Sequence, residues 1–261
     1  MFRRLFAFAV VAAASLCFVH STSATEFQGS YVGVSAGWSG GSSSTGHILT
    51  APSCGGCGAG PAQTAAVSSI SPNLNSNNVT GGIQAGYNWR AGRFVIGVEA
   101  DINYVGLNKS VTTRLTAATP SPKIVTSTDS VNSNWVATLR PRIGYMPTDK
   151  SLVYVTGGVA ASDVNFSNAS TIFSNGVGSI TGVYDSSASK VLGTVIGAGF
   201  EYAWMNNINL KVEYQHLEFG NTTLTGGINS INVGTDLANS SITTNANLKA
   251  NIVRVGANWR Y

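Results

Sequence analysis

The last segment of the chain, ANIVRVGANWRY at residues 250–261, alternates strictly between apolar and polar side chains. A period of two is the spacing of a β-strand, because successive side chains point to opposite faces of the sheet. This segment therefore predicts a strand with one apolar face and one polar face. The apolar set is Val253, Val255, Ala257, Trp259 and Tyr261, and the polar set is Arg254, Gly256, Asn258 and Arg260.

Seven further segments show the same alternation. Each has about the length of a membrane-spanning strand, which needs roughly 9–11 residues when it is tilted. One of them, 152–161, is apolar on both faces, which leaves its orientation open. Together with the closing segment they predict eight strands. The seven segments are 30–38, 79–90, 94–104, 131–145, 152–161, 192–202 and 208–214.

The connections between these segments alternate sharply in length. In an antiparallel sheet, that order places the short connections at one end and the long ones at the other. Outer-membrane barrels are sorted in this way, with short periplasmic turns and long loops outside the cell. We predict an all-β fold: an eight-stranded antiparallel transmembrane β-barrel with four long extracellular loops and short periplasmic turns. The short connections are 90–93, 146–150 and 205–207, and the long ones, rich in Ser, Asn, Thr and Gly, lie near 39–78, 105–130, 162–189 and 220–246.

The start of the chain has the pattern of a secretory signal peptide. Arg3 and Arg4 are followed by an apolar run at 5–19, and small residues end the segment at Ala24. A retained membrane anchor is the alternative, but the apolar run is shorter than the roughly 20 residues that a spanning helix needs. We therefore expect a cleaved signal peptide at 1–24, a barrel domain at 25–261, and export to the outer membrane.

The charge content is low for a soluble protein. Charged residues make up 10% of the chain, whereas a soluble domain has about 25%. The formal net charge of +4 falls to +2 once Arg3 and Arg4 are removed. The sequence therefore lacks the large excess of positive charge that is typical of a protein that binds nucleic acid, and we expect no nucleic-acid partner.

The polar faces of the predicted strands decide which side faces outward. A soluble barrel would carry many Lys and Glu residues on its exterior, but here the polar faces are mostly Gly, Ser, Asn and Thr. Apart from the arginines at the ends of segments, the charges that do occur are four acids and four bases. This balance suits an enclosed interior because an unpaired buried charge is costly. Which acid pairs with which base is not readable from the sequence. The predicted lumen charge network consists of Glu99, Asp101, Arg140, Arg142, Glu201, Lys211, Glu213 and Arg254.

The apolar faces carry aromatic residues near their ends. Aromatic rings are favoured at the two boundaries between lipid and water. We therefore expect the apolar faces to contact outer-membrane lipid, and the alternative is that these rings pack into the core of a soluble barrel. The residues are Trp38, Tyr87, Trp89, Phe94, Tyr104, Tyr145, Tyr202, Trp259 and Tyr261.

One reactive-looking motif lies in the first long connection, where Cys54 and Cys57 are separated by two glycines. In an oxidising compartment we expect a local loop disulfide between them. Covalent haem attachment would need His where Gly58 stands, and a zinc site that used His47 with both thiols would lack a fourth evident ligand. The sequence predicts no cofactor and no metal.

Two histidines remain after the signal peptide, His47 and His216. A haem-binding role would use one of them, or a loop tyrosine such as Tyr184, as axial ligand. Small outer-membrane barrels can also carry enzymes that use a His with a nearby Asp or Ser. No recognisable catalytic pattern accompanies His216, so we do not expect an enzyme.

The segments YVGVSAGW, GGIQAGYNW, FVIGVEAD, WVATLRPRIGY, VYVTGGVA, GTVIGAGFEYAW, LKVEYQHLEFG and VRVGANWRY together resemble the small porin-family outer-membrane proteins of alphaproteobacteria. The eight-stranded OmpA-like and opacity-type barrels are wider relatives. The resemblance covers the predicted strands of the whole mature chain. It implies that the alternating C-terminal residues Val255, Ala257, Trp259 and Tyr261 form the signal read by the barrel-assembly machinery. It also implies an abundant surface protein that contributes to envelope integrity, and relatives are described as porins, antigens or haem binders.

These observations favour a structural role in the outer membrane. An eight-stranded barrel has an interior just wide enough for side chains to fill, and the eight charges would fill it further. We therefore expect a protein that supports envelope integrity and displays surface loops. The alternatives are a narrow passive porin-type channel and a surface receptor that binds haem or a host ligand at the loops.

Overall fold

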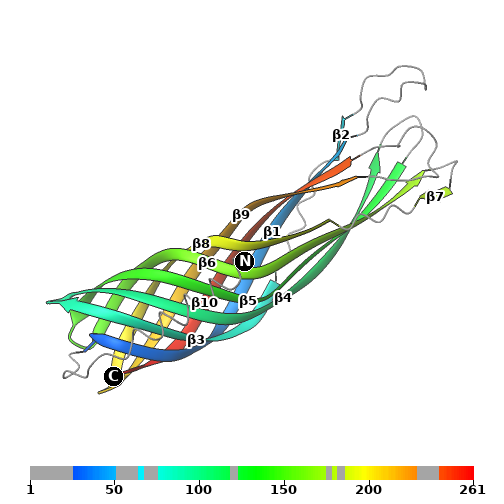
Figure 1. Cartoon of the computed structure of the whole chain (residues 1–261). Coiled ribbons are helices and arrows are strands. Elements are labelled where there is room, and N and C mark those ends of the chain that lie inside the picture. The colour runs from blue at the N-terminus through cyan, green and yellow to red at the C-terminus, as the bar shows by residue number, and fades with distance from the viewer. Residues whose placement is uncertain are drawn as a thin grey trace, which may run out of the picture.

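The computed structural model describes residues 26–50, 64–67, 76–117, 123–174, 178–180, 186–227 and 241–261. Within these residues, no helix has the length and apolar character that crossing a membrane would require. The expected signal peptide at 1–24 lies outside the described residues. The strands (Figure 1) are β1 (Gly29–Thr50), β2 (Thr64–Val67), β3 (Ser76–Ala91), β4 (Phe94–Ala117), β5 (Lys123–Thr148), β6 (Ser151–Ser174), β7 (Gly178–Ile180), β8 (Ser186–Met205), β9 (Ile208–Gly227) and β10 (Ser241–Arg260).

The long strands form a closed antiparallel barrel. Their order is β1-β3-β4-β5-β6-β8-β9-β10, and β10 pairs back onto β1. The closing ladder runs from Tyr31 opposite Arg260 to Thr50 opposite Ser241. Closure satisfies the backbone groups of both terminal strands, which hydrocarbon requires. The predicted eight-stranded barrel is therefore confirmed, while the short strands β2 and β7 pair only with the outer ends of β1 and β6.

Three tight hairpins join neighbouring strands at one end of the barrel. The connections are Gly92-Arg93, Asp149-Lys150 and Asn206-Asn207, each of two residues. Gly92 has a φ of 65°, the left-handed conformation that two-residue hairpins use. We call this end the turn end, and the opposite end, where β2 and β7 lie (Figure 1), the loop end.

The strands are longer than the alternation predicted. The β4–β5 ladder continues to Ala117 opposite Lys123, so most of the segment predicted as a loop at 105–130 is paired strand. Likewise β6 reaches Ser174 and β8 begins at Ser186, within the predicted loop at 162–189. Beyond the lipid neither face needs to be apolar, so the alternation disappears while Thr, Val and Ser residues continue the backbone pairing.

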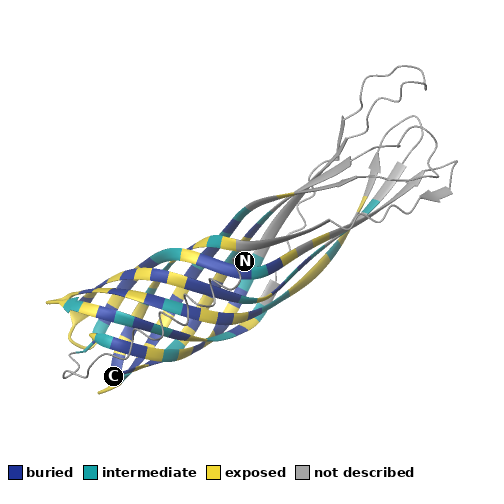
Figure 2. Ribbon diagram, viewed as in Figure 1, coloured by how far each residue is buried: buried dark blue, intermediate teal, exposed yellow. Residues whose placement is uncertain are grey.

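The two faces of the sheet meet different environments. Val34 and Ile83 are 60% and 62% exposed on the outside, whereas Gln84, the residue next to Ile83, is 3% exposed on the inside. Figure 2 shows the resulting checkerboard of exposed and buried positions along every described strand of the barrel wall. In segment 152–161, Val153 and Val155 face outward and Tyr154 faces inward. The orientation that the sequence left open is thereby settled.

Aromatic side chains ring the outside at the turn end. Trp89 and Phe94 flank the first hairpin, and Trp259 and Tyr261 end the last strand, all of them 56–60% exposed. Trp204 belongs to the same ring, although the sequence analysis did not include it. Rings at this height match the lipid–water boundary.

Register shifts interrupt the ladders toward the loop end. Two further shifts, in the β5–β6 and β8–β9 pairs, lie at the turn end. Those toward the loop end lie between Tyr104 and Leu107, Asn132 and Val136, Ala161 and Val164, and Asn247 and Lys249. At the loop-end β5–β6 shift, one carboxylate oxygen of Asp163 accepts hydrogen bonds from the backbone N–H groups of Asn134 and Trp135. Such bulges change which residues face inward, which matters for the composition of the bore.

Candidate functional site

The eight predicted lumen charges all lie inside the barrel. Each is 6% exposed or less, and every one of them takes part in an ion pair with another member of the set. They come from five strands that the closed sheet brings around one bore. The acids are Glu99 and Asp101 on β4, Glu201 on β8 and Glu213 on β9, and the bases are Arg140 and Arg142 on β5, Lys211 on β9 and Arg254 on β10.

Arg140 occupies the centre of this network. Its Nη2 lies 2.6 Å from Glu99 Oε1 and 2.7 Å from Asp101 Oδ2, both on the neighbouring strand β4. Its Nη1 lies 2.8 Å from Glu213 Oε1 on β9. Two strands, β6 and β8, separate β5 from β9 in the barrel wall. Arg140 therefore links the neighbouring strand β4 to β9 on the far side of the bore.

Arg254 and Lys211 complete the bracing. Arg254 Nη2 lies 2.8 Å from Glu213 Oε1 and 3.1 Å from Asp101 Oδ2. Lys211 Nζ lies 2.9 Å from Glu99 Oε1. Because β9 and β4 are four positions apart in a ring of eight strands, the pair of Lys211 with Glu99 joins opposite walls.

Arg142 is held by a charge and by two aromatic rings. Its Nη1 lies 2.6 Å from Glu201 Oε1. Its guanidinium carbon lies 5.0 Å from the ring centroids of both Tyr31 and Tyr154, within the range of a cation–π contact. Tyr31 on β1 and Tyr154 on β6 come from opposite walls, so this guanidinium is clamped across the diameter of the barrel.

Neutral donors supply further bonds to the carboxylates. The Tyr31 hydroxyl donates to Glu99 Oε2 at 2.7 Å, and the Tyr154 hydroxyl donates to Glu213. Thr138 donates to Asp101 at 2.8 Å. Charged groups buried this deeply are tolerated only when they are both paired and hydrogen-bonded. Sequence reasoning missed these partners, although Tyr31 already lay in the inward-facing set of its segment.

Glycines on the inner face make room for the two tyrosines. A Cβ added at Gly86 would overlap the hydroxyl end of Tyr31, and a Cβ added at Gly199 would overlap that of Tyr154. Each glycine therefore lets a long side chain cross the bore next to the wall. The sequence showed these glycines on the polar face without revealing which side chain needs the space.

Gly199→Val is expected to lower the free energy of unfolding by about 1–3 kcal/mol, because the added side chain displaces Tyr154 from Arg142 and Glu213. Urea unfolding of the protein in detergent or lipid, followed by tryptophan fluorescence, measures the change. Gly81→Val is the matched control, since the nearest atom to a Cβ there is a backbone oxygen at 3.7 Å. Equal losses from both variants would contradict the proposed fit of Tyr154 against Gly199.

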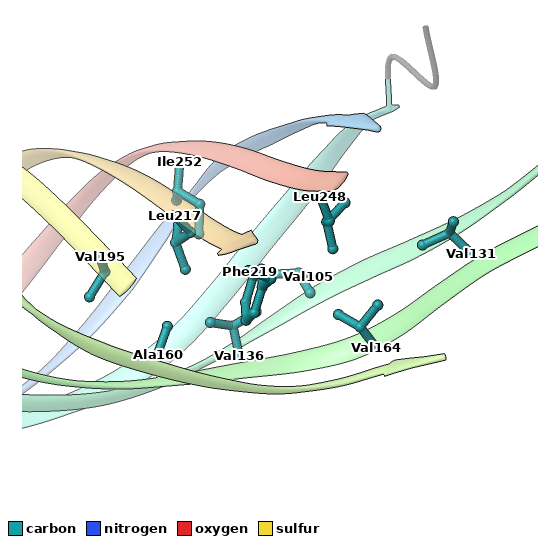
Figure 3. Close-up of a cluster of buried hydrophobic side chains, with 10 residues drawn as sticks. All are labelled: Val105, Val131, Val136, Ala160, Val164, Val195, Leu217, Phe219, Leu248 and Ile252. Atoms are coloured by element: carbon teal, nitrogen blue, oxygen red, sulfur yellow. The ribbon is translucent and has the colours of Figure 1, made fainter. Parts of the chain in front are cut away.

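Apolar residues fill the bore on both sides of the network. At the turn end, Phe27 packs with Val95, Met146, Leu152, Tyr154 and Ala203. Toward the loop end, a larger cluster (Figure 3) surrounds a cavity of about 30 Å³. Sequence analysis did not predict this second cluster, although Val136 alternates in step with Arg140, and Val195 in step with Glu201, both members of the predicted network. Its members are Val105, Val131, Val136, Ala160, Val164, Val195, Leu217, Phe219, Leu248 and Ile252.

The predicted C-terminal assembly signal lies on the outer wall. Val255, Trp259 and Tyr261 are exposed and Ala257 is half-exposed. Ala257 pairs with Val34 on β1 across the seam where the barrel closes. The structure thus presents these side chains in one outward row, and their recognition by the assembly machinery stays a prediction.

The remaining candidates divide into described and undescribed positions. Cys54, Cys57 and Tyr184 lie outside the described residues, and only the strand position of His47 is described. His216 lies on the outer face, where its Nδ1 is 2.8 Å from Asn251 Oδ1. Among the described residues, no group of three or more His, Cys, Asp or Glu side chains is arranged to hold a metal ion.

Comparison with known proteins identifies relatives that are named outer-membrane proteins. The model of the family described as "Outer membrane protein beta-barrel domain" matches residues 9–261. The 31 kDa outer-membrane immunogenic protein of Brucella melitensis is 31% identical over 189 residues, which cover 72% of this chain and 68% of that protein. The 22 kDa outer membrane protein of Rhizobium leguminosarum is 28% identical over 146 residues, or 53% of this chain and 52% of that protein.

Among solved structures, the outer membrane protein OprG from Pseudomonas aeruginosa aligns with 90% of this chain and 97% of its own, at 12% identity and a TM-score of 0.39. The family is shown by its model, which matches nearly the whole chain, and by the Brucella melitensis relative. The resemblance to alphaproteobacterial outer-membrane proteins is therefore confirmed. The chain belongs to the outer-membrane β-barrel protein family and is a protein of the outer membrane.

Proposed function

We propose that this protein is a structural element of the outer membrane, which supports envelope integrity and carries surface-displayed segments on a barrel that does not conduct. The observation that carries the proposal is the network across the bore, in which Arg140 contacts Glu99, Asp101 and Glu213 together. A hydrated ion could pass only by separating these pairs, and separating buried ion pairs is costly.

The apolar layers support the same proposal. One lies on the turn-end side of the charges and the other toward the loop end. A narrow apolar constriction resists wetting and so opposes the passage of ions. The bore therefore presents two different kinds of barrier in series, which favours a structural role over the alternative of a narrow passive channel.

The length of the strands supports the display role. β5 has 26 residues and β4 and β6 have 24 each, whereas crossing the membrane needs roughly 9–11. Relatives are named outer-membrane immunogenic proteins, a name that fits segments reaching the cell exterior. We extend that display role to this chain, with outer-membrane lipid and the barrel-assembly machinery as partners and a host or haem ligand as the class of molecule that the loops would meet.

Planar-bilayer recording tests the proposal. We expect the folded wild-type protein to show no steady conductance, because the network and the apolar layers fill the bore. Folding of each sample is verified by heat-modifiable migration on a gel, so that a silent bilayer is not mistaken for failed insertion. Steady nanosiemens steps from folded wild-type protein would overturn the structural role and favour a channel.

A further inference from the structure

The residues just before β1 have an unusual conformation. Phe27 has a φ of 65°, the one positive φ of a non-glycine residue among those the structure describes. A left-handed conformation is unfavourable for a bulky side chain and persists only where the surroundings hold it. Gly29 follows with a φ of 99°. These two positions bend the chain away from the line of β1.

The side chain of Phe27 is completely buried. It belongs to one apolar cluster with Val95 on β4, Met146 on β5, Leu152 on β6 and Ala203 on β8. In the barrel order, β6 is four positions away from β1 in a ring of eight. The cluster that holds Phe27 therefore includes the wall opposite the strand that it precedes, which places its segment across the mouth of the barrel at the turn end.

A neighbouring strand holds this segment in place. The Arg90 side chain at the end of β3 donates a hydrogen bond from Nη1 to the backbone oxygen of Glu26 at 3.3 Å. On the bore side, Phe27 shares its cluster with Tyr154, whose ring stacks on Arg142 and whose hydroxyl donates to Glu213. The segment thus lies directly beneath the charge network.

We propose that residues 26–28, which we call the N-terminal cap, form a plug that seals the periplasmic mouth of the barrel, with Phe27 as its side chain. Within the turn-end cluster, Phe27 is the one residue that belongs to no strand, so the cap can leave the mouth without breaking the barrel wall. It keeps periplasmic water away from Tyr154 and the ion pairs above it.

Closure of the barrel and docking of the cap are coupled. The cluster that holds Phe27 draws on β4, β5, β6 and β8, and the strand that Phe27 precedes meets β10 at the seam that closes the ring. The Tyr261 backbone N–H donates to the Ser30 carbonyl at 3.1 Å next to the cap. The docked cap therefore marks, and adds stability to, the completed barrel.

Thiol accessibility tests the cap in the full-length protein. Cys54 and Cys57, the two cysteines that follow the expected signal peptide, are replaced by serine. A single reporter is introduced as Leu152→Cys beneath the cap or as Val195→Cys in the apolar cluster toward the loop end. A charged, membrane-impermeant thiol reagent is then added to the folded protein. We expect Phe27→Ala to make the reporter at 152 react about tenfold faster and to leave the reporter at 195 unchanged, because only the turn-end mouth opens.

Phe94→Ala is the matched control, because Phe94 lies at the same end of the barrel but is 59% exposed on the outer face. It should change neither reporter. Should Phe27→Ala fold poorly, Phe27→Leu keeps part of the plug. It is expected to increase the reaction rate of the reporter at 152 by a smaller factor and to leave that of the reporter at 195 unchanged. An unchanged rate at 152, or equal increases at 152 and 195, would overturn the cap. Neither readout depends on whether the bore conducts, so this test and the bilayer recording can fail separately.

Discussion

Arg140→Met is expected to lower the free energy of unfolding by about 3–5 kcal/mol, the cost of removing one partner from a buried ion pair. The substitution keeps an apolar stem of similar length but removes one of the two guanidinium groups that contact Glu99, Asp101 and Glu213 together. The other is that of Arg254. Three carboxylates would then face a bore with one base fewer. Urea unfolding of the protein in lipid vesicles, followed by tryptophan fluorescence, measures the loss.

Lys249→Met is the matched control for this effect. Lys249 lies on β10 toward the loop end, and its Nζ is 3.1 Å from Glu218 Oε1 in a pair whose side chains are 45% and 42% exposed. Exposed pairs of this kind contribute little, so we expect a change within about 0.5 kcal/mol. If Arg140→Met cost no more than Lys249→Met, the cross-bore bracing would have no energetic role.

Val255→Arg is expected to cost about 2–4 kcal/mol of folding free energy, as for an Arg near the midplane on the lipid face of a barrel. Val255 is 54% exposed on the outer wall, and its neighbours across the ladders are Ala36 and Val212. All three meet lipid in this orientation. The yield of heat-modifiable protein after insertion into vesicles, together with its unfolding free energy, gives the measurement.

Asn108→Arg controls for the added charge. Asn108 is exposed on β4 beyond the register shift toward the loop end, so the guanidinium would lie in water. A surface substitution there should change the free energy by no more than about 0.5 kcal/mol. Equal insertion of both variants would mean that Val255 does not face lipid.

The alternation of side chains was sufficient to predict the strands, the closed barrel and the inward direction of the charges. It could not predict the pairing of those charges. Lys211 and Glu99 meet because β9 and β4 stand on opposite walls, and the distance across a bore is not encoded in the period of a single strand. For the same reason, the partners of Tyr31 and Tyr154 emerge only when the barrel is closed.

Other features escaped prediction for local reasons. Val131 and Val136 both face inward although they are five positions apart, because a register shift between them reverses the alternation. The apolar cluster toward the loop end depends on such shifts. The outer ends of the strands lack the alternation in sequence because neither face needs to be apolar beyond the lipid. Phe27 precedes the first strand, where no period applies.

The central claim is that the apolar face of each strand contacts lipid while the polar face encloses a filled bore. Labelling with a photoactivatable reagent dissolved in the bilayer, read by mass spectrometry at single residues, tests it most directly. We expect label at Ile83 and Val255 and none at Gln84 and Asn258. Label at Gln84 and Asn258 with Ile83 and Val255 spared would contradict the orientation of the whole barrel.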